Sequence, residues 1–269
     1  MGAPRTGFAY LDDPTADGGV VAMAHRGGAG SEDLVGLENT AHAFRHAVAL
    51  GFTYLETDVH LNRSGDLIAF HDEVLDRVTN LTGRIADADT EMIRTARIGG
   101  QYPVPWLSEL LEEFPDARFN IDLKGPGTDT ALADLLDRTG AHDRVCVGSF
   151  SLPRIRAFRR RTAGRVATSA APVEVGLYLA APTGGLARIL TGAKVPVLQV
   201  PHRRGSVPVV TRSLIRRAHA AGAHVHVWTI NDPAEMADLL DLGVDGLITD
   251  RIDVLKDLLI ARGLWSPVL

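Results

Sequence analysis

Residues 118–124 read R-F-N-I-D-L-K, and this stretch decides the fold. Successive side chains of a strand point to opposite faces, so one face here is apolar and the other polar. The apolar face carries Phe119, Ile121 and Leu123, and the polar face carries Asn120, Asp122 and Lys124. Because helices follow the other predicted strands, both faces should be covered, and covered polar groups are costly unless they are paired. The stretch therefore predicts the polar mouth of a barrel.

Strands and helices alternate along the chain. Nine segments are typical of strands, namely 21–25, 54–61, 67–71, 118–124, 145–150, 166–169, 195–200, 224–230 and 244–249. Residues 67–71 follow a turn signal at 62–65, so we expect a hairpin arm there. The other eight segments match the strand number of a TIM (β/α)8 barrel. A doubly wound open sheet is the competing prediction, but no glycine-rich nucleotide loop follows the first strand.

One α/β domain is expected over residues 1–269, and 72–105 are expected to form a small insertion beyond the second strand. Residues 40–50 carry an apolar helical stripe that Asn39 or Thr40 can cap and Gly51 can end.

Composition excludes several classes of protein. The net charge of −5 argues against a nucleic-acid binder, and no apolar run reaches the ~18 residues of a stable membrane insertion. Residues 1–19 lack the apolar core of a secretory signal. The single cysteine, Cys146, rules out an intrachain disulfide and is expected to be buried in a strand. These features favour a cytoplasmic protein.

Four polar groups fall where barrel strands should end. They are His25 and Arg26 with residues 38–40, then Glu56 with Asp58, then His71 with Asp72, and finally Asn120, Asp122 and Lys124. Because active sites of TIM barrels gather at the carboxyl ends of the strands, we expect these groups to converge on one pocket.

The residue types suggest one kind of chemistry. Three carboxylates without nearby cysteine favour Ca²⁺ or Mg²⁺ over zinc, and they belong to Glu56, Asp58 and Asp122. Two cations, Arg26 and Lys124, could hold a phosphate. Two imidazoles, His25 and His71, suit a general acid and a general base. Together they describe a site that cleaves a phosphodiester.

The same residues belong to longer motifs. These are His25-Arg26-Gly27, Glu38-Asn39-Thr40, Glu56-x-Asp58, His71-Asp72, Asn120-x-Asp122-x-Lys124, Trp228-Thr229-x-Asn231 and Gly243-x-Asp245-Gly246 with Thr249-Asp250. In order and spacing the chain resembles the glycerophosphodiester phosphodiesterase family over about residues 21–262. The resemblance implies a TIM-barrel hydrolase of lipid and glycerol metabolism. Such an enzyme converts a small-molecule glycerophosphodiester into sn-glycerol 3-phosphate and an alcohol, with a divalent cation.

The resemblance also implies roles. It places the catalytic pair on His25 and His71, metal ligation on Glu56, Asp58 and Asp122, and substrate contacts on Arg26, Lys124 and Trp228. The resemblance also implies residues that hold these groups in position without contacting the substrate, namely Glu38, Asn39 and Asn120. Three features depart from the family pattern: Leu37 stands where proline is usual, the 28–37 loop is longer, and Asp122 stands where glutamate is usual.

Other functions stay open at this point. A phospholipase-D-like or lysophospholipid-cleaving relative would differ mainly in lipid access, and a catalytically silent barrel could bind phosphodiesters without cleaving them. Both histidines are present, and this argues against a barrel without catalytic activity, which would not need an acid–base pair. A metal amidohydrolase would be expected to show His-x-His where residues 25–27 read His-Arg-Gly. The sequence predicts no oligomeric state.

Five further features carry weaker expectations. The arginines of residues 154–161 are expected on a solvated helix face, with contact to anionic lipid headgroups as the alternative. Residues 202–204 could meet a charged headgroup. His226 is expected to be a hydrogen-bonded packing residue, Asp245 to serve a turn and Asp250 to cap a helix.

Overall fold

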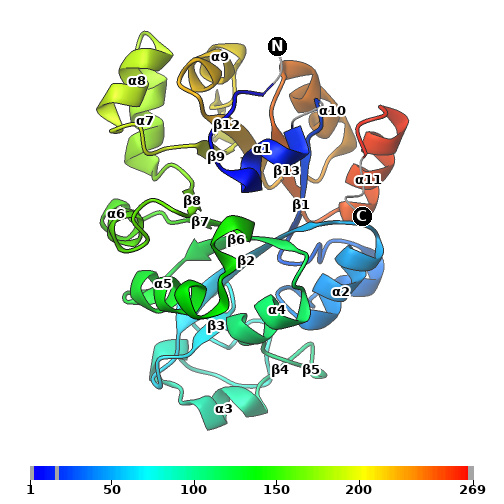
Figure 1. Ribbon diagram of the computed structural model, residues 1–269. Coiled ribbons are helices and arrows are strands. Elements are labelled where there is room, and N and C mark those ends of the chain that lie inside the picture. The colour runs from blue at the N-terminus through cyan, green and yellow to red at the C-terminus, as the bar shows by residue number, and fades with distance from the viewer. Residues whose placement is uncertain (1–2, 16–17, 266–269) are drawn as a thin grey trace.

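The computed structural model describes residues 3–15 and 18–265 and contains a ring of eight parallel strands (Figure 1). In ring order they are β1 (Val21–His25), β2 (Tyr54–Leu61), β6 (Arg118–Leu123), β7 (Val145–Gly148), β8 (Ala167–Thr168), β9 (Val197–Pro201), β12 (His224–Trp228) and β13 (Gly246–Thr249). β13 pairs with β1, and a parallel bridge between Ser169 and Val197 joins β8 to β9. The predicted TIM barrel is confirmed, and the doubly wound sheet is wrong.

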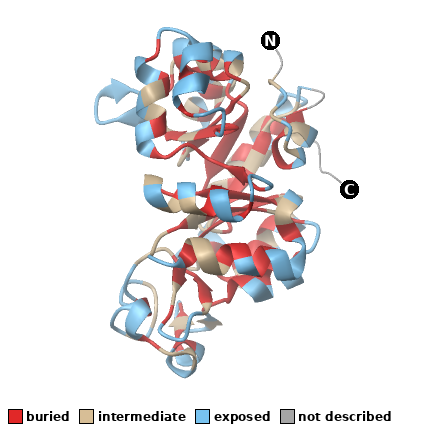
Figure 2. Ribbon diagram, turned by 60° about the vertical axis from the view of Figure 1, so that its left-hand side comes forward, coloured by how far each residue is buried: buried red, intermediate tan, exposed pale blue. Residues whose placement is uncertain are grey.

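Helices cover the outside of the ring, and Figure 2 shows buried strands beneath helices with exposed outer faces. They are α2 (Ala41–Ala49), α4 (Leu107–Glu113), α5 (Thr128–Thr139), α6 (Leu152–Arg161), α7 (Pro172–Ala180), α8 (Gly184–Leu190), α9 (Arg212–Ala220), α10 (Pro233–Leu242) and α11 (Ile252–Ala261). Thr40 caps α2 as predicted, because its hydroxyl accepts the Ala43 N–H at 3.1 Å. None of the helices described here is long and apolar enough to cross a membrane.

The alternation along β2 separates two cores from the mouth of the barrel. Leu55 and Val59 point outward and pack beneath the helices. Tyr54 points inward, and its hydroxyl donates to the Tyr10 carbonyl of α1 (Ala9–Thr15), the helix that packs against this end of the barrel. Cys146 is buried in the same inner cluster, as predicted, and burial raises its pKa to about 12. Further along the inward face of β2 come Glu56, Asp58 and His60, so the barrel interior turns polar at its mouth.

A small lobe lies between β2 and β6. It starts with β3 (Leu67–Ala69), which pairs antiparallel with β2 and confirms the predicted hairpin arm. The lobe continues through α3 (Thr90–Thr95), β4 (Arg97–Ile98) and β5 (Tyr102–Pro103). Its own apolar cluster includes Phe70, Leu75, Ile85, Ile93, Ile98 and Trp106. The insertion after the second strand is therefore present.

Several strands are shorter than predicted. The chain leaves the ladder at Gly148 and Trp228, whereas the sequence pattern extended to residues 150 and 230. Beyond β12 the apolar Ile230 is buried in the core, whereas Phe150, beyond β7, is exposed and lines the cavity described below. Short segments complete the structure: the single-turn helices Glu32–Leu34, Ile85–Asp87 and Ala141–Arg144, and the exposed hairpin of β10 (Arg203–Arg204) and β11 (Val207–Pro208).

Candidate active site

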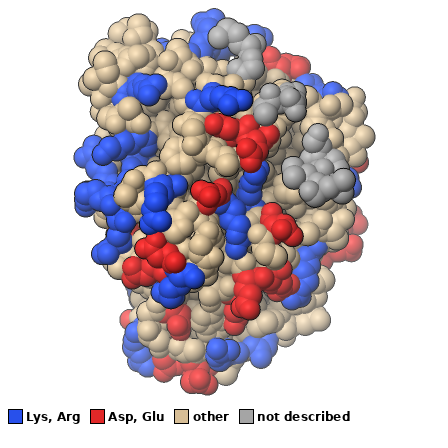
Figure 3. All heavy atoms as spheres, viewed as in Figure 1, with Lys and Arg blue, Asp and Glu red and all other residues tan. Residues whose placement is uncertain are grey.

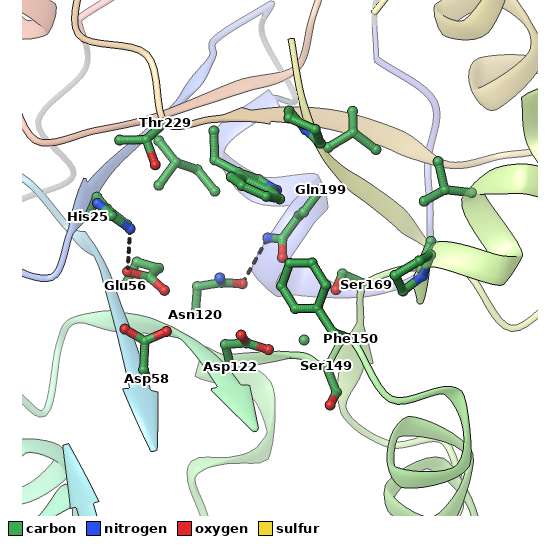
Figure 4. A pocket seen from close by; sticks show the side chains of 18 of the residues that line it. His25, Glu56, Asp58, Asn120, Asp122, Ser149, Phe150, Ser169, Gln199 and Thr229 are labelled. Atoms are coloured by element: carbon green, nitrogen blue, oxygen red, sulfur yellow. Dashed lines mark hydrogen bonds and ion pairs between the residues drawn. The ribbon is translucent and has the colours of Figure 1, made fainter. Parts of the chain in front are cut away.

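A cavity of about 640 Å³ opens at the carboxyl ends of the barrel strands (Figure 4). It brings together nine side chains singled out in the sequence: His25, Arg26, Glu56, Asp58, His71, Asn120, Asp122, Lys124 and Trp228. They come from segments far apart in the sequence, from β1 to β12. Because the strands of the ring are parallel, their carboxyl ends meet at one rim of the barrel. Glu38 and Asn39 lie outside this lining, where supporting residues were expected.

His25 ends β1, and its ring lies between two carboxylates. Nδ1 is 2.6 Å from Oδ1 of Asp250, and Nε2 is 3.8 Å from Oε2 of Glu56, the pair joined by a dashed line in Figure 4. Burial opposes the charged ring, yet Glu56 and Asp250 together raise the pKa of His25 above its ordinary value. Asp250 thus engages Nδ1 and leaves Nε2 facing the cavity.

His71 follows the hairpin arm and is held in the same way. Its Nδ1 lies 2.6 Å from Oδ1 of Asp72, whose other oxygen accepts a hydrogen bond from Arg77 at 2.6 Å. The Arg77 guanidinium holds the pKa of Asp72 at about 2, so this carboxylate stays ionised beside the ring. Arg77 also donates to Glu38 at 2.7 and 2.9 Å, which ties the small lobe to the loop after β1.

Carboxylates from β2 and β6 lie side by side on the cavity floor (Figure 4). Asp58 is the register partner of Asp122, and the Lys124 ammonium bridges them at 2.8 and 2.6 Å. Burial raises the pKa of Asp122, whereas Lys124 and then Arg26 outweigh burial at Asp58 and lower its pKa. Burial, aided by repulsion from Asp58, raises the pKa of Glu56 to about 7. The floor therefore holds carboxylates that a further cation would stabilise.

Arg26 links the first loop to this floor. Its backbone N–H donates to Oε2 of Glu56 at 3.1 Å, and its Nε lies 3.2 Å from Oδ2 of Asp58. Its guanidinium also donates to Glu38 at 3.1 Å. The next residue must be Gly27, because its φ is +88° and a Cβ there would lie 2.7 Å from the Ala43 side chain.

Two asparagines support the floor by hydrogen bonds. Asn39 accepts from the Thr57 hydroxyl at 2.7 Å, and Asn120 accepts from the Gln199 amide at 2.8 Å. Gln199 itself lines the cavity, and sequence reasoning missed it. Its signal was weak, since a single glutamine inside an apolar strand has many explanations.

The opposite wall of the cavity is largely apolar. The rings of Phe150 and Trp228 meet edge to face, 6.0 Å between centroids, and the Lys124 ammonium lies 5.8 Å from the Phe150 centroid. Beyond them the wall is formed by Pro172, Val175, Leu179, Pro201 and Val209, with Arg204 of the exposed hairpin at its edge. The cavity thus joins a charged end to an apolar end.

The carboxylate floor fits a hard cation in its donor chemistry. Lys124 takes one oxygen of Asp58 and one of Asp122. The second Asp58 oxygen is buried without a hydrogen-bond partner, although Arg26 lies near it. Among residues 3–15 and 18–265, no cluster of three or more His, Cys, Asp or Glu side chains is arranged for metal binding.

Two expectations about the last barrel strand are wrong. Asp250 does not cap α11, whose preceding residue, Arg251, makes no capping bond. Instead Asp250 binds His25 and accepts from the Asn231 amide at 2.9 Å, so it belongs to the site. The Asp245 carboxylate binds distant segments rather than its own turn: it accepts the Val225 N–H of β12 at 2.7 Å and lies 2.8 Å from Nε2 of His219 on α9.

Three other expectations also need correction. Arg159 is not solvated; it is buried and forms an ion pair with Glu174 at 2.6 Å. His226 is buried, as expected, but neither ring nitrogen has a hydrogen-bond partner in the described structure, and burial lowers its pKa to about 3. Of residues 202–204, Arg204 lines the cavity, whereas His202 pairs with Glu235 and Arg203 donates to the Ser206 carbonyl.

Known proteins match this chain over most of its length. Residues 25–254 match the glycerophosphoryl diester phosphodiesterase family. Probable glycerophosphodiester phosphodiesterase 2 of Mycobacterium tuberculosis is 41% identical over 251 residues, which are 93% of this chain and 94% of that protein. The glycerophosphodiester phosphodiesterase of Agrobacterium tumefaciens has the same fold, with a TM-score of 0.72 at 24% identity over 87% of this chain and 98% of that one. An Oleispira antarctica phosphodiesterase, solved with its product sn-glycerol-3-phosphate, gives 0.74 at 22% identity over 89% and 96%.

Proposed function

This chain belongs to the glycerophosphoryl diester phosphodiesterase family, and we propose that it cleaves glycerophosphodiesters into sn-glycerol 3-phosphate and an alcohol by two-histidine acid–base catalysis. The observation that carries the proposal is the pairing of His25 with His71 on one cavity, each with an aspartate at Nδ1. The product bound in the Oleispira antarctica phosphodiesterase supports this choice of substrate. A cytoplasmic location, favoured by the single buried thiol, is part of the proposal.

The two histidines divide the proton transfers. One takes a proton from the water whose oxygen attacks phosphorus, and the other gives a proton to the oxygen of the departing alcohol. Asp250 and Asp72 hold each ring with Nε2 toward the substrate. Arg26 and Lys124 stabilise the negative charge of the phosphoryl group as it grows in the transition state. Trp228 covers the glycerol part.

We further propose that Glu56, Asp58 and Asp122 hold Ca²⁺ or Mg²⁺. Their hard oxygen donors suit these ions, and Oδ2 of Asp58, which is buried without a hydrogen bond and has only the ion pair with Arg26 among the described residues, supports the assignment. When bound, the ion would polarise a phosphoryl oxygen as a Lewis acid. Lys124 pairs with one oxygen of Asp58 and one of Asp122, which leaves the second oxygen of Asp122, and the Asp58 oxygen that faces Arg26, for such an ion.

A turnover panel tests the proposal. Glycerophosphocholine, glycerophosphoethanolamine, glycerophosphoinositol and a lysophospholipid are each incubated with Ca²⁺, Mg²⁺ or Mn²⁺. Released glycerol 3-phosphate is measured enzymatically, and lysophosphatidic acid from the lysophospholipid is measured by mass spectrometry. We expect release from at least one of the first three substrates. Cleavage that yields free choline phosphate instead would contradict the proposed bond, and so would tight binding of every substrate without turnover.

A lysophospholipid is the second candidate substrate, and the apolar wall favours it. Val175, Leu179 and Val209 could accept the first carbons of an acyl chain beyond the glycerol. In that case the lysophospholipid arm of the panel gives the higher kcat/KM and yields lysophosphatidic acid.

We predict that Asp250→Asn lowers kcat about 10–100-fold, the usual cost of losing the partner that orients a functional histidine. The amide keeps the shape of Asp250 but can donate to Nδ1, which favours the wrong tautomer of His25. Steady-state kinetics checks this. Asp253→Asn on α11 serves as the matched control, because within the described part of the chain its side chain pairs only with Arg251, outside the cavity. An unchanged kcat would contradict the prediction that Asp250 orients His25 for catalysis.

A further inference from the structure

The surface of α7 and α8 is apolar where surface helices are normally charged. Residues 166–193 contain two charged side chains, Glu174 and Arg188, and Glu174 is buried against Arg159. Of the twelve exposed large apolar side chains in the described residues, five lie on these two helices: Val173, Leu179, Leu186, Ile189 and Leu190. Ile189 is 75% exposed. A concentration of exposed apolar side chains on two contacting helices is typical of an interaction surface.

Cations without partners surround the same surface. A groove of about 740 Å³ between α6, α8 and the 191–196 loop is lined by Arg5, Arg156, Arg160, Arg188 and Lys194. None of these five side chains makes an ion pair or a side-chain hydrogen bond to the described residues. Glu174, the acidic residue of the groove, is already paired. Figure 3 shows Lys and Arg gathered along the left edge of the molecule, the side of α6 and α8.

We propose that this surface docks on an anionic lipid bilayer. Exposed aliphatic side chains gain free energy by entering the boundary between headgroups and acyl chains, and nearby arginines bind the lipid phosphates. A soluble polyanion would leave the aliphatic side chains in water. A second copy of the chain would place the two sets of cations against each other in a symmetric contact. The combination of apolar helices and unpaired cations therefore fits lipid better than either.

The docking surface adjoins the active site through α7. Pro172, Val175 and Leu179 of this helix line the catalytic cavity, while Glu174 and Tyr178 line the basic groove. Docking through α7 and α8 would therefore bring the cavity mouth beside the membrane. Such docking would give the cavity access to substrates released at the lipid surface, and this consequence rests on the proposed function. Binding of the protein to the membrane does not rest on it.

Vesicle co-sedimentation tests the contribution of the exposed apolar side chains of α7 and α8 to membrane binding. We expect binding to vesicles of phosphatidylglycerol and phosphatidylcholine at 50 mM salt, and weak binding to phosphatidylcholine alone. Ile189→Asp should lower the partition coefficient at least tenfold, since it puts a charge into the apolar boundary. Ile260→Asp is the matched control, because Ile260 is an exposed isoleucine (52%) on α11. Equal binding of the two variants would overturn the proposal.

Charge variants test the contribution of the cations of the groove to membrane binding. The double variant Arg188→Gln/Lys194→Gln should bind about 25-fold more weakly, roughly fivefold for each cation near an anionic surface. Arg84→Gln in the small lobe, whose partner is the exposed Glu73, is the control. Raising the salt to 500 mM should weaken wild-type binding and narrow the difference between wild type and double variant. A double variant that binds like wild type would contradict the role of the groove.

Two other results would assign the surface elsewhere. Thermal stabilisation by pyrophosphate that the double variant loses, without vesicle binding, would make the groove a site for free phosphate. A dimer that Ile189→Asp dissociates, again without vesicle binding, would make the patch a subunit interface. Turnover of glycerophosphocholine without vesicles is measured in parallel, and it should be equal in all variants. Absence of wild-type turnover of every substrate in the panel would count against the proposed function and leave the docking test intact.

Discussion

Replacing His71 by alanine should lower kcat by on the order of 10²–10⁴-fold, and His25→Ala should have a similar effect. Each change removes a group that moves a proton in the transition state, while the cavity floor keeps its cations. Substrate binding should change little, so the loss should appear in kcat more than in KM. The measurement is steady-state release of glycerol 3-phosphate, with melting temperatures recorded for both variants.

The control for these variants is His46→Ala on α2, a histidine without a side-chain partner among the described residues and outside the cavity. If both histidines act in the same chemical step, the fold-reduction in kcat of the double variant should be much smaller than the product of the two single-variant fold-reductions. A His71→Ala protein with near-normal kcat would refute the acid–base pair.

The alternation of residues 118–124 was enough to predict the mouth of the barrel. Asn120 and Asp122 face the cavity, and Phe119, Ile121 and Leu123 pack under the helices, as the two-residue period of a strand requires. The same period placed Glu56 and Asp58 on one side of β2. A polar face on a covered strand is costly, so its presence in the sequence already implied a site.

Asp250 could not be assigned from its local sequence. It lies 225 positions from His25, and an aspartate just before a helix is typical of a cap. Only closure of the barrel, with β13 beside β1, brings the two side chains together. Gln199 and Arg77 were missed for the same reason: each acts through a residue from a distant segment. Contacts between distant segments depend on the fold, which a local pattern does not contain.

The arginines of α6 show how helical periodicity can mislead. Five arginines in ten residues indicated a solvated face, but Arg159 follows the buried Phe158 and turns inward. Its buried guanidinium pairs with the buried carboxylate of Glu174 on α7. Its partner lies 15 residues away on another helix, where the local pattern could not place it.

Removing divalent metal should abolish most activity, and adding Ca²⁺ or Mg²⁺ should stabilise the fold. Asp58 and Asp122 face each other across two strands with Glu56 close by, and one lysine and one arginine do not fully neutralise three carboxylates. Burial, with repulsion from Asp58 added to it, raises the pKa values of Glu56 and Asp122. An ion at 100 times its Kd adds about 2.7 kcal/mol, or a rise of about 5–10 °C in Tm for a chain of this size.

Substitutions at Asp122 make this prediction specific. Asp122→Glu keeps the carboxylate and should preserve activity, whereas Asp122→Asn should weaken metal binding and reduce the rise in Tm, with Asp134→Asn on α5 as the exposed control. Because the aspartate side chain is short, Ca²⁺, with bonds of about 2.3–2.6 Å, should be accepted more readily than Mg²⁺, which needs about 2.0–2.1 Å. The titration follows activity and Tm after exhaustive chelation. Full activity in the chelated protein, with no rise in Tm when either ion is added, would remove the metal from the mechanism and leave Lys124 as the cation of the floor.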